Sequence, residues 1–374
     1  MLTLRADQAR LKGLALARVG GAQVKMPLEL TVEGPGLIGY TAYADREPVG
    51  SEVLVRTRIS GIKHGTELNM YRGTLPFADE VFDRDLRLFR PARGDERVAP
   101  FYPHTLGSWA AGVVEAIGPD VRCFAPGDWV HGEWKHRETA LKPEATLYPI
   151  DPASDGETMV FTDPARFALA ATHDAAIKLG DRVAIFGLGA IGMLAAQMAR
   201  LSGASFVCGV DPLPKRRDLA MQLGADLALN PVDGDAGLAI KQATDGAGVD
   251  VAIELSGAYA ALQQAMRAVH KQALVVTASY YGDQAGRVDL SREWHHNRVT
   301  LRSSMPVWDC DHRCAPMWDL RRLEHTAVAL LAGQTLRVKP LIGARVPFAH
   351  AAEAYALIDA VPEGHIKVLL TYPD

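Results

Sequence analysis

Apolar and polar positions follow two different patterns along this 374-residue chain. Up to about residue 165, short apolar runs such as 52–59 and 111–117 read as strands separated by glycine-containing turns. From about residue 166 to 304, apolar strands alternate with helical stretches. The strands expected in that region are 182–187, 206–210, 249–254, 273–277 and 298–303. Such alternation is typical of an α/β protein with a doubly wound parallel sheet.

Beyond this region the pattern changes again. A helical stretch is expected over 318–331, ended by Gly333, and a last strand over 366–371. No internal repeat or low-complexity linker interrupts the chain.

A glycine-rich turn joins the strand at 182–187 to the helix that follows it, with the sequence Gly-Leu-Gly-Ala-Ile-Gly at 187–192. Gly187 permits a tight turn, Gly189 lets the backbone approach a pyrophosphate, and Gly192 lets the helix pack close to the strand. The helix N-terminus at Ala190 and Ile191 would offer backbone N–H groups and a positive dipole end to the phosphates. The pattern therefore predicts a dinucleotide site, against the alternative of a purely structural turn.

An acidic residue, Asp211, lies 19 residues after Gly192, at the end of the second strand. A carboxylate there can accept hydrogen bonds from the adenosine ribose and repels a 2′-phosphate, so the sequence favours NAD over NADP. Three basic residues, 215–217, follow closely and weigh against this preference. We interpret them as the solvated first turn of the next helix.

The composition is that of an ordinary globular protein, with 48% apolar and 22% charged residues and a net charge of −4. This charge shows no excess of basic residues that would attract nucleic acid or an anionic membrane. No apolar run is long enough for a membrane span. Residues 1–7 show no secretory signal, and four cysteines suggest no disulfide framework. We therefore expect a cytoplasmic protein.

Several short motifs follow one another along the chain. They are the loop Gly65–Gly73, the segment Leu106–Gly118, Gly-Asp-Trp-Val at 127–130, the strand Asp250–Gly257 and the stretch from Pro340 to Tyr355. Together they resemble the motifs of the medium-chain dehydrogenase/reductase superfamily, in particular its zinc alcohol and polyol dehydrogenases.

The resemblance covers most of the chain and carries expectations about its architecture. It implies a GroES-like partial β-barrel made of residues 1–165 and 306–374, and a Rossmann domain of residues 166–305. It also implies an active site in the cleft between them, Ser256 beside the nicotinamide ribose, and a homodimer or homotetramer.

The departures from the family pattern concern its zinc ligands. The resemblance puts His64 at the usual cysteine, Ser108 at the usual histidine, Trp109 at the usual glutamate and Asp163 at the third ligand. Histidine and aspartate are competent zinc ligands, but serine is a poor one. The cysteines of the family's structural zinc lobe are also missing. We expect no metal; the alternative is a non-standard zinc site that recruits His104 or Glu67 as its third ligand.

Without zinc, side chains must manage the charge that develops on the substrate oxygen. The candidates are Lys63 as an electrophile or base, His64 as the proton acceptor, Thr66 as a relay hydroxyl, and Asp163. Asn69, Ser108 and Trp109 are expected to face the substrate. The alternatives are structural: a surface charge for Lys63, a loop histidine for His64 and a turn hydroxyl for Thr66.

The segment 75–102 is longer than the family usually has, and it contains Arg84, Arg87, Arg90, Arg93 and Arg97. A solvated surface loop is one interpretation, and a substrate lid or oligomer contact is the other. The segment 309–314 has two cysteines and one histidine, too few ligands to predict a metal site.

Three functions remain open at this point. The first is an NAD-dependent dehydrogenase that oxidises a secondary alcohol, such as a polyol, a sugar derivative or a ring carbinol, to a ketone. The second is a metal-free NAD(P)H-dependent reductase of a conjugated C=C bond or a quinone, against which Asp211 counts because such enzymes more often use NADPH. The third is a nucleotide-binding protein without turnover.

Overall fold

The computed structural model describes residues 16–19, 22–75, 79–94, 96, 101–281, 288–307 and 311–373. The N-terminal residues 1–7, Arg97 and Cys310, which figure in the sequence analysis, lie outside these ranges. The chain divides into two compact units. The first unit comprises Met1–Phe161 and Ile342–Asp374, and the second comprises Thr162–Leu341.

The division differs from the expected one mainly where the chain returns from the second unit to the first. This boundary falls between residues 341 and 342, and not between 305 and 306. The intervening helix α10 (Leu320–Ala332) packs against α4 (Thr162–Ala175), the first helix of the second unit. Arg166 on α4 donates to Glu324 on α10 at 2.5 Å, and the ring of His173 lies 4.3 Å from that of Trp318. These contacts assign residues 306–341 to the second unit.

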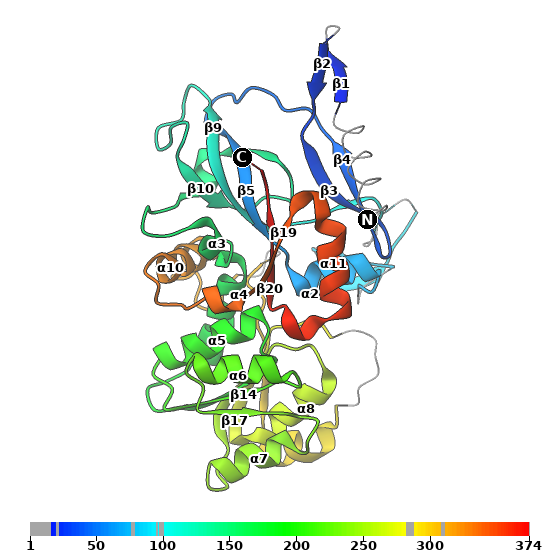
Figure 1. The fold of residues 1–374 in the computed structure, drawn as a ribbon. Coiled ribbons are helices and arrows are strands. Elements are labelled where there is room, and N and C mark those ends of the chain that lie inside the picture. Colours follow the sequence, from blue (N-terminus) through cyan, green and yellow to red (C-terminus); the bar gives the residue numbers. More distant parts are fainter. Residues whose placement is uncertain are drawn as a thin grey trace. The chain divides into compact units, whose positions relative to one another are not determined.

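The second unit is built on a parallel sheet with the strand order β15-β14-β13-β16-β17-β18 (Figure 1). Its strands are β13 (Arg182–Phe186), β14 (Phe206–Val210), β15 (Leu227–Leu229), β16 (Val249–Glu254), β17 (Val269–Thr277) and β18 (Thr300–Ser303). This is the strand order of a doubly wound Rossmann sheet. The chain adds strands towards one edge from β13 to β15, and from β16 it adds them towards the other edge. The strands expected from the sequence agree with five of these to within two residues at each end, except that β17 begins four residues earlier than expected; the short β15 was not expected.

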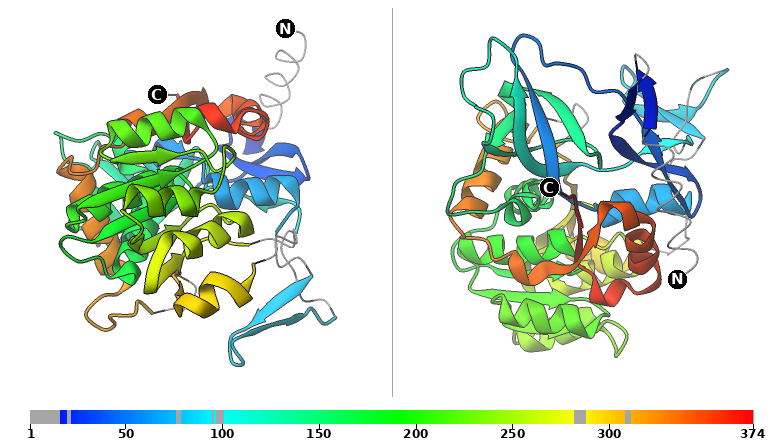
Figure 2. Two further views of the ribbon diagram at one scale, coloured as in Figure 1. Left: turned by 90° about the horizontal axis from the view of Figure 1, so that it is seen from below. Right: turned by 45° about the horizontal axis from the view of Figure 1, so that its top comes forward.

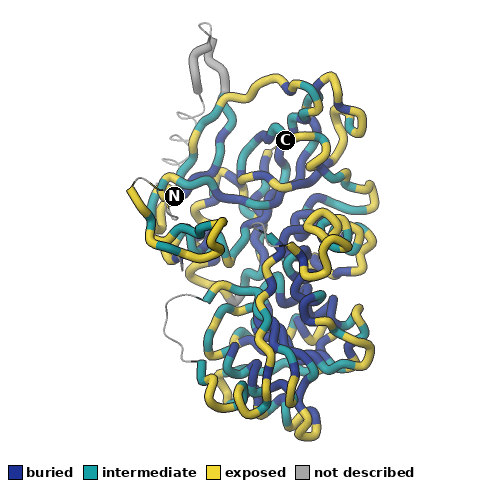
Figure 3. Tube along the Cα trace, turned by 180° about the vertical axis from the view of Figure 1, so that it is seen from behind, coloured by how far each residue is buried: buried dark blue, intermediate teal, exposed yellow. Residues whose placement is uncertain are grey.

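Helices cover both faces of this sheet (Figures 1 and 2). The helices α5 (Ala190–Leu201) and α6 (Pro214–Gln222) lie on one face, and α7 (Ala236–Ala243) and α8 (Tyr259–Ala268) on the other. The central strands are consequently buried on both sides, as Figure 3 shows. Residues 183–186 of β13 are each at most 1% exposed.

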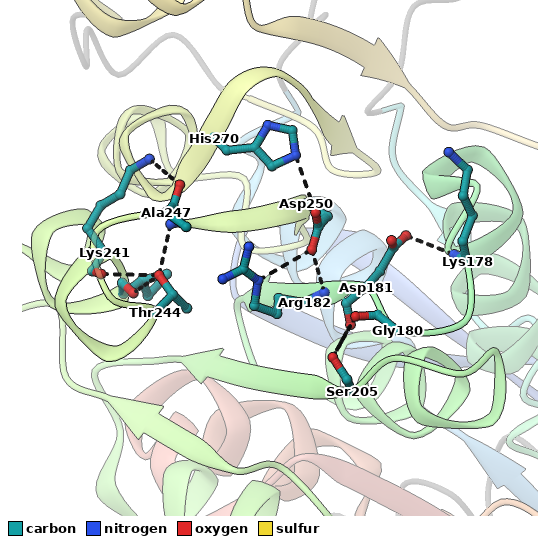
Figure 4. Close-up of polar contacts among 12 residues, drawn as sticks. Lys178, Gly180, Asp181, Arg182, Ser205, Lys241, Thr244, Ala247, Asp250 and His270 are labelled. Carbon is teal, nitrogen blue, oxygen red and sulfur yellow. Dashed lines mark hydrogen bonds and ion pairs between the residues drawn. The ribbon is translucent and has the colours of Figure 1, made fainter.

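Polar contacts fix the amino-terminal edge of the same sheet (Figure 4). Asp250 at the start of β16 accepts the Arg182 backbone N–H at 2.7 Å and lies 3.3 Å from the His270 ring nitrogen. The Ser205 hydroxyl donates to the Gly180 carbonyl at 2.6 Å. These contacts hold the strand starts in register and leave the carboxyl edge for the glycine-rich turn.

The first unit contains a curved, mostly antiparallel sheet in which β9 (Trp109–Ile117) pairs with β5 (Glu52–Gly61) and β10 (Trp129–Gly132). The strand β20 (Lys367–Thr371) pairs with the other edge of β5 and with β19 (Ile342–Pro347). The remaining elements are β1 (Leu16–Val19), β2 (Ala22–Lys25), β3 (Leu28–Gly34), β4 (Leu37–Ala42), β8 (His104–Thr105), β11 (Thr139–Pro143), β12 (Leu147–Pro149), and the helices α2 (His64–Arg72), α3 (Gly156–Met159) and α11 (Ala351–Ala360).

One hydrophobic core joins α2 and α11 to the strands β3 and β20. Ile62, Tyr355 and Val368 are buried in it at 0% exposure. The C-terminal segment therefore completes the unit that the N-terminal segment begins, as the resemblance implies.

The long segment 75–102 contains a hairpin of β6 (Glu80–Asp83) and β7 (Leu88–Pro91) (Figure 2). Arg90 pairs with Asp83 at 3.3 Å and with Glu96 at 2.7 Å. Arg90 therefore forms ion pairs within the segment itself. A role of the segment 75–102 as a substrate lid stays a prediction. Among the described helices, none combines the length and apolar character that a membrane crossing requires.

Candidate functional site

The glycine-rich turn lies where β13 ends at the carboxyl edge of the sheet. Gly187 adopts a φ of +89°, and a Cβ there would lie 2.7 Å from the Ser256 backbone nitrogen. A Cβ on Gly192 would lie 2.9 Å from the Gly187 carbonyl carbon and closer still to its oxygen. Both positions therefore require glycine for the fold itself.

Gly189 differs from its two neighbours. It is the N-cap of α5 with a φ of −74°, and a Cβ there would meet nothing within 4 Å. No side chain caps the helix at this residue. The N-terminal turn of α5, with Ala190 and Ile191, is thus open to an anion from outside, and this arrangement fits a pyrophosphate.

Asp211 lies directly after β14 and is 3% exposed. One carboxylate oxygen accepts the Leu188 backbone N–H at 2.8 Å, and the other accepts that of Leu213 at 2.9 Å. Asp211 therefore holds the glycine-rich turn, and each oxygen keeps a second lone pair that can accept a ribose hydroxyl.

The basic residues after Asp211 are not all a solvated turn. Lys215 is exposed, as expected, but the Arg216 guanidinium lies 3.6 Å from the Asp211 carboxylate. Arg217 donates to the Asp211 carbonyl at 2.8 Å. The interpretation as a solvated turn is wrong for these two arginines, because they fold back onto the end of β14.

A buried carboxylate organises the neighbouring loop at the end of β16. Glu254 is 0% exposed and accepts hydrogen bonds from the Ser256 backbone at 2.7 Å, from the Ser256 hydroxyl and from the Tyr281 hydroxyl. Burial raises the pKa of Glu254, and these hydrogen bonds counteract part of that rise. The structure thus brings Ser256 beside Gly187 and orients it through Glu254.

The candidates of the first unit gather at the start of α2. Lys63 is its N-cap, and His64, Thr66 and Asn69 follow within the helix. All four side chains are half-buried. Asn69 accepts a hydrogen bond from the Thr74 hydroxyl at 3.5 Å, which ties the end of the helix to the next loop.

Trp109 is the first residue of β9, and Ser108 directly precedes it. The Ser108 hydroxyl oxygen is buried and has no hydrogen-bond partner among the described residues. Trp109 is 1% exposed, and its indole N–H donates to Nδ1 of His131 at 3.0 Å. Burial lowers the pKa of His131 to about 3, so this ring is neutral and its Nδ1 can accept the hydrogen bond from the indole N–H. A substrate contact by Trp109 stays a prediction, while its role in this aromatic cluster with Tyr148 is seen directly.

Asp163 belongs to the second unit, at the start of α4, and is 1% exposed. Its carboxylate accepts a hydrogen bond from the Arg166 guanidinium at 3.1 Å. A buried carboxylate that a guanidinium engages in this way is suited to a structural or electrostatic role, and a catalytic role for Asp163 stays a prediction.

Two glutamates are buried, Glu67 within α2 and Glu254 at the end of β16. The sequence suggests Glu67 only as a recruited ligand of a non-standard zinc site and gives Glu254 no role. The only sequence signal for Glu254 was its place in a family-like motif just before Ser256. Glu67 stands three residues after His64, in a segment where the sequence alone gives no sign of burial.

Zinc is implied by the resemblance, and the residues at the ligand positions do not suit it. Ser108 offers only a hydroxyl, and the Asp163 carboxylate is engaged by Arg166. Among the described residues, no three histidine, cysteine, aspartate or glutamate side chains form a group that could hold a metal ion.

Comparison with known proteins places this geometry in a family. Residues 190–320 match the family model described as zinc-binding dehydrogenase. A D-guloside 3-dehydrogenase from Escherichia coli (strain K12) is 35% identical over 349 residues, which is 92% of this chain and 99% of that protein.

Solved structures share the fold. A protein from Sinorhizobium meliloti 1021 with bound NADP has a TM-score of 0.72 and 23% identity, over 93% of this chain and 99% of that one. A protein from Escherichia coli CFT073 with bound NADH has a TM-score of 0.72 and 19% identity, over 92% and 99% of the two chains. The chain therefore belongs to the medium-chain dehydrogenase/reductase superfamily, in the group of zinc-type alcohol and polyol dehydrogenases.

Proposed function

We propose that this protein is an NAD-dependent dehydrogenase that oxidises a secondary alcohol of a polyol, a sugar derivative or a ring carbinol to a ketone. The observation that carries the proposal is the open N-terminus of α5 at Gly189 beside the Asp211 carboxylate, which fits a dinucleotide. The similarity to a D-guloside 3-dehydrogenase over almost the whole of both chains supports a sugar-derived alcohol as the substrate.

The choice of NAD over NADP rests on Asp211. Its carboxylate would repel a 2′-phosphate, but Arg216 at 3.6 Å would attract one. Because the carboxylate also anchors the glycine-rich turn at Leu188, it cannot swing away to make room for a phosphate without breaking that contact. We expect kcat/KM with NAD⁺ to exceed that with NADP⁺ by roughly tenfold or more, as one hydrogen bond to a charged group allows. A preference for NADP⁺ that disappears in Arg216→Ala would reverse this assignment.

The residues at the start of α2 would handle the proton. A bound NAD⁺ would accept the hydride from the carbinol carbon. His64 would take the hydroxyl proton, with Thr66 as the connecting hydroxyl, because imidazole is the side chain whose ordinary pKa lies nearest to neutrality. The Lys63 ammonium would stabilise the negative charge that develops on the substrate oxygen. Ser108 and Asn69 offer hydrogen-bonding groups to the remaining substrate hydroxyls.

The experiment is to follow the absorbance of NADH while purified protein, without added metal, meets NAD⁺ and a panel of glycosides, polyols and cyclic alcohols. Reduction of NAD⁺ with one of these classes supports the dehydrogenase. No reduction with any of them, but oxidation of NAD(P)H by an enone or quinone, would favour the reductase.

A matched pair of variants then tests the proposed base. His64→Ala should lower kcat by roughly a hundredfold to ten-thousandfold, the usual contribution of general base catalysis. His296→Ala changes an exposed histidine of the second unit and should leave kcat unchanged. Equal rates in both variants would remove His64 from the mechanism.

A further inference from the structure

A buried polar network centres on Glu67, a residue whose side chain points into the first unit. Glu67 is 3% exposed, yet its carboxylate accepts three hydrogen bonds. The donors are the Lys63 backbone N–H at 2.9 Å, His136 Nε2 at 3.1 Å and the Tyr355 hydroxyl. Burial acts to raise the pKa of Glu67, but the charge of His136 and these hydrogen bonds outweigh it and lower the pKa to about 2.

The partners of Glu67 are themselves fixed. His136 is 0% exposed, and its Nδ1 lies 2.7 Å from the Ser60 hydroxyl on β5. Tyr355, also at 0% exposure, is anchored in α11. We call Glu67, His136 and Tyr355 the Glu67 network. Each member comes from a different part of the chain, so the network fixes the position of α2 against β5 and α11.

The network acts on the turn that carries the proposed catalytic residues. The Glu67 carboxylate accepts the Lys63 N–H, while the Glu67 N–H donates to the Lys63 carbonyl at 2.9 Å. This reciprocal pair closes the backbone of Lys63–Glu67, much as a capping box closes a helix start. His64 and Thr66 lie inside the closed turn, so their Cα positions depend on it.

The same network reaches the segment before Ser108. The His136 backbone N–H donates to the Leu106 carbonyl at 2.9 Å, and a Cβ on Gly107 would collide with the His136 backbone nitrogen. His136 thus packs directly against the residues that lead into Ser108. The His136 ring contacts Glu67 in the turn that contains His64, and the His136 backbone is hydrogen-bonded to the loop before Ser108.

We propose that Glu67, held by His136 and Tyr355, is a positioning residue that sets the Lys63–Thr66 turn for the reaction. The inference rests on the proposed function, since the turn matters for turnover only if His64 and Thr66 act there. A buried carboxylate is a costly way to stabilise a fold, because an apolar side chain of similar size does so without the cost of desolvation. Its three hydrogen bonds give the turn a single geometry.

The test compares two buried or half-buried tyrosines that both anchor α11. Tyr355→Phe removes a donor to Glu67. Tyr40→Phe removes a hydroxyl that donates to the Phe348 carbonyl at 2.6 Å and accepts the Ala351 N–H at 3.2 Å, at the start of the same helix. Both variants should lose some thermal stability. Tyr355→Phe should lower kcat roughly tenfold to a hundredfold with the KM for NAD⁺ unchanged, since small misplacements of catalytic groups cost that much. Tyr40→Phe should stay within about twofold of wild type in kcat.

A second readout does not depend on turnover. The Cε1–H resonance of His64 can be assigned with His64→Asn and followed by NMR in Tyr355→Phe, Glu67→Gln and Tyr40→Phe. The first two variants should shift this resonance, and the third should leave it in place. If the wild type oxidises no alcohol, the proposed function fails, and the resonance still decides whether the network sets the turn. An unmoved resonance in Tyr355→Phe and Glu67→Gln, or equal losses of kcat in the two tyrosine variants, would overturn the inference.

Discussion

One added methyl group should destabilise the fold at Gly192 and leave its stability nearly unchanged at Gly189, although both glycines belong to the same turn. In Gly192→Ala the new carbon would lie 2.9 Å from the Gly187 carbonyl carbon, whereas carbon atoms in ordinary contact are about 3.5–4.0 Å apart. The start of α5 must therefore move away from the end of β13. Overpacking of this kind costs about 1–3 kcal/mol, and a backbone neighbour that cannot turn aside puts this case at the upper end. In Gly189→Ala the methyl group meets nothing within 4 Å, so the free energy of unfolding should stay within about 1 kcal/mol of wild type.

NADH binding should fall in both variants, but for different reasons. In Gly192→Ala, the start of α5 moves away from the end of β13 and takes its backbone N–H groups with it. In Gly189→Ala the added methyl group would occupy the space through which a pyrophosphate approaches the N-terminus of α5, so we expect Kd for NADH to rise at least roughly tenfold, or about 1.4 kcal/mol. The assay is NADH fluorescence for binding and urea unfolding for stability. Gly364→Ala in the first unit, where a Cβ also meets nothing, should change neither quantity. Wild-type NADH affinity in Gly189→Ala would refute the assignment of the dinucleotide to this turn.

The remaining predictions concern buried carboxylates. Asp163→Asn should lower the free energy of unfolding by about 1–3 kcal/mol in urea, because it removes one buried anionic partner of the Arg166 guanidinium while Glu324 still compensates its charge. A loss below about 0.5 kcal/mol would mean that the pair is not structural. Glu254→Gln places an amide N–H₂ among donors from Ser256, so NADH affinity should fall several-fold in a fluorescence titration. Unchanged affinity would mean that this loop has no part in cofactor binding. For Glu67 the pKa is lowered from 4.5 to about 2, so its ionised form stabilises the folded state by about 3 kcal/mol at neutral pH and this stabilisation is lost as the pH falls from about 4.5 towards 2. The stability difference between wild type and Glu67→Gln should shrink over this range in urea unfolding, and a difference independent of pH would contradict the pairing.

Much of the second unit could be predicted because its signals are local. The strand at 182–186 is a run of apolar residues buried on both faces, and the glycines at 187 and 192 are required by contacts close to the turn. The helix at 320–332 was also predicted, but its periodicity does not say which unit it joins. That depends on α4, about 150 residues earlier in the chain, through contacts such as Arg166 with Glu324 at a separation of 158 residues.

The candidate site in the first unit was predicted less completely, because its determinants are distant in sequence. Lys63, His64 and Thr66 follow from the family-like loop. The partners of Glu67 lie 69 and 288 residues away, at His136 and Tyr355. No periodicity or spacing within the chain connects such residues, and only the packing of β5, α2 and α11 brings them together. The predicted solvated turn is wrong for Arg216 and Arg217 for a related reason, since their contacts with Asp211 depend on the turn after β14.

The most direct test of the proposed function is the reduction of NAD⁺ by metal-depleted protein with a glycoside or polyol that carries a free secondary hydroxyl. We expect a steady rise in NADH absorbance that needs no added zinc, and a rate at least roughly a hundredfold lower in His64→Ala. Turnover that appears only with stoichiometric zinc, and vanishes when the metal is removed, would contradict the metal-free chemistry proposed for the Lys63–Thr66 turn.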